Sequence, residues 1–81
     1  MTAEEIIIER EKSHGSFGCT ATIAQATKRI WHMQMGWEDL TDVQRESLDS
    51  IATKVARILA GNPADQDHWQ DIQGYAKLGG G

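Results

Sequence analysis

Acidic side chains stand in pairs at helical spacing in the second half of the chain. Asp67 and Asp71 are four residues apart, so on a helix both carboxylates lie on one face. Glu46 and Asp49, three residues apart, do the same on the helix expected before it. Two antiparallel helices that each present two carboxylates can hold Mg²⁺, which prefers oxygen ligands and substrate phosphates. The structural alternative is that Asp67 caps a helix and that Glu46 and Asp49 form a solvated face.

Basic and aromatic residues lie within reach of these acids. Lys54 and Arg57 are three residues apart on the third expected helix. Their charged heads can neutralise a ligand phosphate, or they can pair with Asp67 and Asp71 across two helices. Tyr75 follows Asp71 by one turn and can stack on a base. These residues predict either a nucleotide site or salt bridges that tie the last two helices together.

A third candidate is the pair Arg10 and His14, which are four residues apart where the first expected helix ends. Histidine can act as an acid, a base or a cation at a helix end. This pair therefore predicts either part of a ligand site or a helix cap. A zinc site is not predicted, because Cys19 and the histidines show none of the short spacings of zinc ligands.

Periodicity and capping signals place these residues on helices. Thr2 with Glu5 and Thr41 with Gln44 are capping-box patterns, and Gly36 is typical of a helix stop. The predicted helices span residues 1–12, 20–35, 41–60 and 66–78. The expected fold is all-α, a compact four-helix bundle-like arrangement that forms one domain over residues 1–81.

The third helix carries the clearest apolar stripe. Leu48, Ile51, Val55 and Ile58 repeat at spacings of three, four and three, which is one face of an α-helix. We expect these four side chains to be buried.

Composition narrows the classes of function. The chain has 81 residues, 12 of them acidic and 8 basic, and a net charge of −4. The basic residues form no cluster, so direct nucleic-acid binding is not expected. One cysteine and an acidic start without a signal-peptide pattern favour the cytoplasm, and no apolar run is long enough for a membrane span. Because a domain of this size buries a small core, we expect a homo-oligomer.

Three segments resemble a group of small phage and prophage proteins. They are the stretches 10–15, 44–59 and 67–76, and the match covers Arg10 to Leu78. The group is similar to an uncharacterised MazG-like family, whose pattern ends in Asp-x-x-x-Asp-Ile-x-Gly-Tyr-Ala. The shared positions are Arg10, Gly15, Lys54, Arg57, Asp67, Asp71, Gly74 and Tyr75. The early aromatic of that pattern is His14 in this chain.

The resemblance implies a fold and a cofactor. MazG-type enzymes are helical nucleoside triphosphate pyrophosphohydrolases that hold Mg²⁺ between paired acidic helices. Their motif is Glu-Glu-x-x-Glu followed by Glu-x-x-Asp. This chain has Glu46-x-x-Asp49, but Glu4 and Glu5 are followed by three isoleucines. Whether the chain is an enzyme stays open, and no catalytic residue is assigned.

Two hypotheses follow. In the first, a phage-type accessory protein binds a phosphorylated nucleotide through Lys54, Arg57, Asp67 and Asp71, with Mg²⁺ and residual pyrophosphohydrolase activity left open. In the second, the chain is a non-enzymatic phage inhibitor of the anti-defence or anti-CRISPR type. Such an inhibitor would bind a host protein in the host cytoplasm. The incomplete acidic motif favours the second, and the pairing of Lys-x-x-Arg with Asp-x-x-x-Asp favours the first.

Overall fold

The computed structural model of the chain describes the backbone of residues 1–14 and 16–81 and the side chains of residues 1–10 and 16–81. Within these ranges the chain is helical and contains no strand. In order, the elements are α1 (Ala3–His14), α2 (Phe17–His32), the 3₁₀ helix η1 (Met35–Asp39), α3 (Asp42–Ala60) and α4 (Gln66–Gly80). The predictions of an all-α fold and of four α-helices are confirmed.

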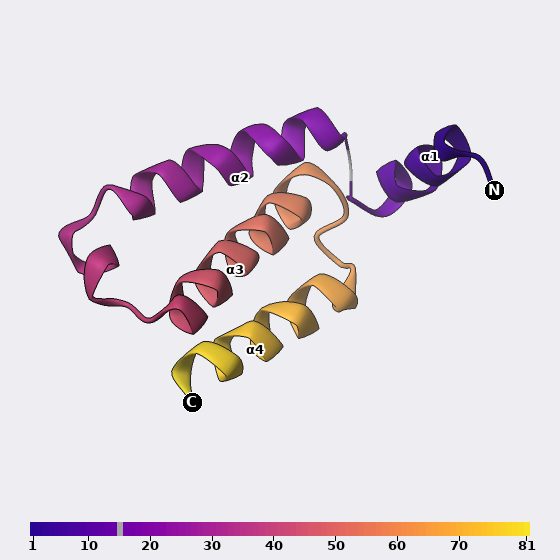
Figure 1. Cartoon of the computed structure of the whole chain (residues 1–81). Helices are drawn as coiled ribbons and strands as arrows, with labels where there is room; N and C mark the ends of the chain where they lie inside the picture. The colour runs from indigo at the N-terminus through magenta and orange to yellow at the C-terminus, as the bar shows by residue number, and fades with distance from the viewer. Residues whose placement is uncertain (15) are drawn as a thin grey trace.

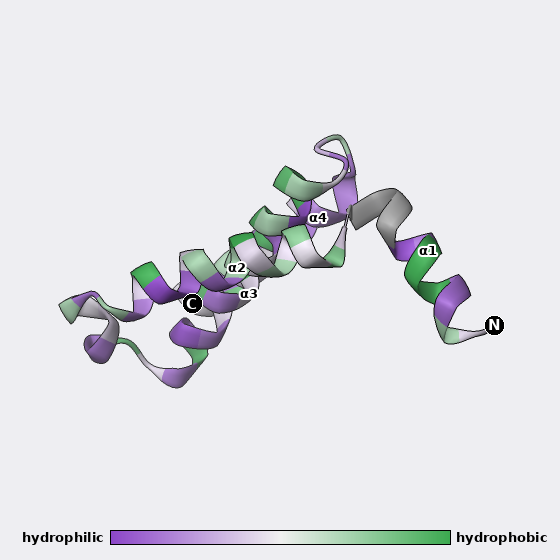
Figure 2. Ribbon diagram, turned by 90° about the horizontal axis from the view of Figure 1, so that it is seen from above, coloured by the Kyte–Doolittle hydropathy of each residue, from purple (hydrophilic) through white to green (hydrophobic). Residues whose placement is uncertain are grey.

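The third helix is the centre of the arrangement. α3 lies between α2 and α4, and successive helices of this group run in opposite directions (Figure 1). α1 stands beyond one end of the group, as the view from above also shows (Figure 2). None of the helices in the described residues is long and apolar enough to cross a membrane.

Capping side chains fix where the helices begin. The Thr41 hydroxyl accepts from the Gln44 amide at 3.1 Å, and the Gln44 side chain accepts from the Thr41 amide at 3.0 Å. The predicted capping box is thus confirmed. Ser16 caps α2 by accepting from the Cys19 amide at 3.4 Å, so α2 begins at Phe17 and not at residue 20. This helix also ends three residues earlier than predicted, and Gly36 lies inside η1.

The predicted core stripe of α3 is partly wrong. Ile58 is buried, but Leu48 and Ile51 are only half-buried and Val55 is 36% exposed. The reason is that α3 has neighbours on two different sides, so it buries two faces rather than one. The residues between those faces, Val55 and Leu59, stay exposed to solvent.

The face toward α2 is lined by small residues. Ala52 and Ala56 are buried one turn apart, and Ala24 is buried on α2. Methyl side chains let two helices approach closely, which a row of large residues would prevent. Thr20 on α2 is also buried.

The face toward α4 includes Ser47, Lys54 and, by helical spacing, Ile58. Ser47 approaches Gly79 of α4 so closely that a Cβ at position 79 would lie 3.0 Å from the Ser47 Cβ. A side chain at position 79 would force Ser47 to shift by a few tenths of an ångström, so the glycine lets the last turn of α4 pack closely against α3.

Candidate functional site

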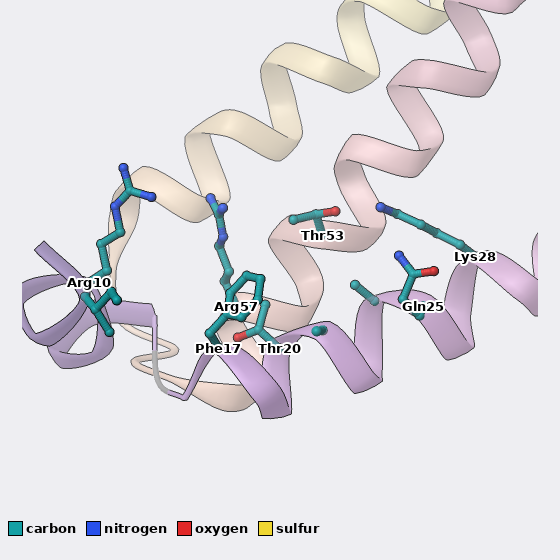
Figure 3. Close-up of a pocket in the computed structure, with 10 residues that line it drawn as sticks. Arg10, Phe17, Thr20, Gln25, Lys28, Thr53 and Arg57 are labelled. Carbon is teal, nitrogen blue, oxygen red and sulfur yellow. The ribbon is translucent and has the colours of Figure 1, made fainter. Parts of the chain in front are cut away.

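A cavity of about 480 Å³ opens where α1, α2 and α3 meet. Ile7 and Arg10 line it from α1, and Thr53 and Arg57 line it from α3. The residues that α2 contributes to the lining are Phe17, Thr20, Ala21, Ala24, Gln25 and Lys28. Figure 3 shows the Arg10 and Arg57 side chains extending to the same side from their two helices.

The charged groups of this cavity that belong to described residues all have one sign. Arg10, Lys28 and Arg57 come from three different helices, and the described lining residues include no Asp or Glu. A chain with a net charge of −4 thus gathers three cations around one hollow. The apolar part of the lining includes Ala21, Ala24 and the ring of Phe17, which is 77% exposed. Such a lining suits a ligand that carries both negative charge and a flat apolar group.

Lys54, three residues before Arg57, has a different environment. Its Nζ lies 2.7 Å from the Asp71 Oδ2, and the Lys54 side chain is only 15% exposed. The hydrogen bond from Lys54 holds the pKa of Asp71 below its usual range, and the charges of Lys54, His68 and Arg57 act in the same direction. Of the two roles weighed for Lys54 and Asp71, the geometry shows the salt bridge between α3 and α4.

Asp67 and Tyr75 lie on α4, which contributes no residue to the described lining of the first cavity. Asp67 is exposed in the first turn, where its amide donates to the Asp65 side chain at 3.0 Å. The N-cap of α4 is therefore Asp65 and not Asp67. Tyr75 lines a second cavity of about 300 Å³ between α3 and α4, together with Leu48 and Ile51. The predicted ligand residues Arg57 and Tyr75 thus line two separate cavities.

Glu46 and Asp49, the two acids of α3 that were predicted as metal ligands, have different surroundings. Asp49 Oδ1 lies 2.8 Å from His32 Nε2 on α2, and the His32 ring packs on Trp37 with centroids 4.3 Å apart. Glu46 is exposed. In the part of the chain that the structure describes, no group of three or more His, Cys, Asp or Glu side chains is arranged to hold a metal ion. The Mg²⁺ ligands Asp67, Asp71, Glu46 and Asp49 stay a prediction.

Sequence reasoning named Arg10 and Arg57 but missed Lys28 and Phe17. The signal that could have found them is a stripe on α2: Phe17, Ala21, Ala24 and Lys28 follow at spacings of four, three and four. The predicted role of His14 falls outside the described side chains.

No protein-family model, curated protein or solved structure matches the chain. What the cavity binds is therefore inferred from its charges, its volume and its lining.

Proposed function

We propose that the chain binds a phosphorylated nucleotide in the cavity between α1, α2 and α3. The observation that carries this proposal is the gathering of Arg10, Lys28 and Arg57 from three helices, with no acidic residue among the described lining. Guanidinium groups bind phosphate oxygens through two parallel hydrogen bonds, and lysine adds a point charge. The volume of about 480 Å³ is within the range of small-molecule sites.

Phe17 supplies a surface for the base. Its ring lines the same cavity as the cations and is 77% exposed. Stacking of a base on an aromatic side chain contributes about 1–3 kcal/mol and tolerates every base, because each base has a π-face. A nucleotide with its phosphates at the cations and its base on Phe17 therefore matches both parts of the lining.

Mg²⁺ enters this proposal with the ligand. The metal usually keeps several waters and binds through substrate phosphates with one or two carboxylates. Asp71 pairs with Lys54. Arg57 lines the cavity without an acidic neighbour in the described lining, so it can bind phosphate without a preformed metal site. The resemblance to the MazG-like group supports a nucleotide as the ligand. We include residual hydrolysis of a nucleoside triphosphate to a monophosphate and pyrophosphate in this proposal.

The experiment is a thermal-shift screen of nucleoside mono-, di- and triphosphates with and without Mg²⁺. A ligand that binds only the folded state stabilises it by about 2.7 kcal/mol at a concentration about 100 times its Kd. We expect at least one nucleotide to raise the melting temperature of the native chain and to have little effect on Arg57→Gln. Equal shifts in both proteins, or no shift with any nucleotide, would contradict the proposal.

A second candidate function is inhibition of a host defence factor by protein–protein binding. It is favoured by a surface at the other end of α2, where Met33 and Met35 are 79% and 91% exposed and the acidic residues Glu38 and Asp39 follow. Exposed methionines adapt to partner surfaces. Its test is phage survival on bacteria with a defence system. Replacing Met33 and Met35 by Ser should abolish protection, whereas Arg57→Gln should leave it intact.

We also propose that the chain self-associates in the host cytoplasm. Support comes from apolar side chains that this small domain leaves in solvent, among them Ile6, Ile7 and Ile8 of α1, which are 37%, 53% and 57% exposed.

A further inference from the structure

α1 presents two chemically different faces. Ile7 and Arg10 line the cavity of their own chain. Glu4 and Ile8 are four residues apart and share another face, and Glu5 and Glu9 continue it around the helix. These acids are exposed, as is Ile8. This acidic face of α1 (Glu4, Glu5, Ile8 and Glu9) thus surrounds one large apolar side chain with negative charge.

The acidic face of α1 and the cavity are complementary. The cavity offers Lys28 and Arg57 as positive charges around Phe17, which is 77% exposed. An isolated helix of about 12 residues is marginal in water and needs a packing partner. Yet α1 stands at the end of the molecule (Figures 1 and 2), and its isoleucines stay 37–57% exposed. An acidic helix face with an apolar centre fits a basic hollow with an apolar wall.

From this complementarity we infer that the acidic face of α1 of one copy docks over the basic cavity of a second copy. The exchange is reciprocal and closes a two-fold dimer. The occupant of the cavity in the absence of ligand is therefore a second copy of this chain. Because the contact is small and depends on exposed charges, the dimer should dissociate at high salt.

The inference has a regulatory consequence, which rests on the proposed nucleotide site. The acids of the second copy and the phosphates of a nucleotide meet the same cations, so they compete. A bound nucleotide should convert dimer to monomer, and dimerisation should weaken nucleotide binding by the same factor, since coupling between two ligands is reciprocal.

The test is sedimentation velocity at micromolar concentration and low salt. We expect the native chain to form dimers, and the double variant Glu4→Lys with Glu5→Lys to raise the dimer dissociation constant at least about tenfold. The matched control is Glu38→Lys with Asp39→Lys, which makes the same change of charge at two exposed adjacent acids of η1. The control should stay dimeric. A native chain that is monomeric under these conditions, or equal dissociation of both variants, would overturn the inference.

Mixing two weakened variants separates docking from a loss of α1 structure. The Glu4→Lys/Glu5→Lys chain and Arg57→Glu should each be mostly monomeric, and their mixture should form a heterodimer because the reversed charges attract. A mixture that stays monomeric would overturn the inference.

The last experiment adds ATP to the native dimer. If ATP binds but leaves the dimer intact, shared use of the cavity is wrong. If no nucleotide binds while the charge-reversal pattern holds, the dimer stands and the proposed function fails.

Discussion

α3 meets its two neighbours in different ways. Toward α4, its cation Lys54 lies 2.7 Å from the Asp71 carboxylate, and Ser47 packs against Gly79. Toward α1 and α2, its cation Arg57 lines an open cavity with Arg10 and Lys28 and no acid among the described lining. Lys54 and Arg57 are three residues apart and carry the same charge. Two equal charges at motif spacing thus have different surroundings: Lys54 pairs with an acid of the neighbouring helix, and Arg57 lines a cavity.

The largest expected effect tests whether the α4 side of α3 is part of the core. Ile58 is 8% exposed and Val55, three residues earlier, is 36% exposed. Ile58→Ala should lower the free energy of unfolding by about 2–5 kcal/mol, because it leaves a cavity. Val55→Ala should cost less than about 1 kcal/mol, since it removes a smaller group from a side chain that is already 36% exposed. Urea denaturation of both variants measures the difference. Equal losses would mean that α3 buries a single stripe after all.

The second prediction compares the two cations directly. Arg57→Gln should weaken nucleotide binding by about 1.5–3 kcal/mol, the contribution of hydrogen bonds to charged groups, and should hardly change the melting temperature. Lys54→Gln should do the reverse, because it removes the partner of Asp71. Calorimetric titration with a nucleotide and thermal unfolding of each variant give the two readouts. The distinction between the two sides of α3 fails if both variants lose affinity equally.

The third prediction concerns two glycines of α4. A Cβ at Gly74 would meet no atom within 4 Å, whereas a Cβ at Gly79 would lie 3.0 Å from the Ser47 Cβ. Gly74→Ala should therefore stabilise the chain by about 0.5–1 kcal/mol through helix propensity. Gly79→Ala should gain less or destabilise, because Ser47 must move. Chemical denaturation of the two variants is the measurement, and a larger gain for Gly79→Ala would disprove close packing at the end of α4.

The smallest expected effect is a pH dependence. Lys54 lowers the pKa of Asp71 in the folded state. The stabilisation from this pair is therefore fully present above the ordinary aspartate pKa of about 3.9 and is lost as the pH falls through the lowered pKa. Asp71→Asn should flatten this part of the curve of unfolding free energy against pH. If the unfolding free energy of the variant falls at low pH as steeply as that of the native chain, the Lys54–Asp71 pair does not stabilise the fold.

Much of the fold could be predicted from the sequence because its signals are local. The capping box of Thr41 and Gln44 formed as expected, and α3 and α4 begin within a residue of the predicted positions. The two buried faces of α3 could not be predicted, because a 3.6-residue period shows which residues are apolar and not how many neighbours a helix has. Val55 was misjudged for this reason.

The candidate site was predicted only in part. Arg10 and Arg57 were named, but from patterns within single helices. Their meeting with Lys28 depends on where α1, α2 and α3 lie in space. Spacing along one helix carries no such information, so Tyr75, one turn from Asp71, was grouped with a cation that lines a different cavity.

We propose that the cavity between α1, α2 and α3 is the ligand site. A titration of isotope-labelled protein with ATP, followed by amide chemical shifts in NMR spectra, tests it most directly. We expect saturable shifts that centre on Phe17, Lys28 and Arg57 and are much reduced in Arg57→Gln. Shifts that centre instead on Asp71 and Tyr75, or no saturable shift with any nucleotide, would contradict it.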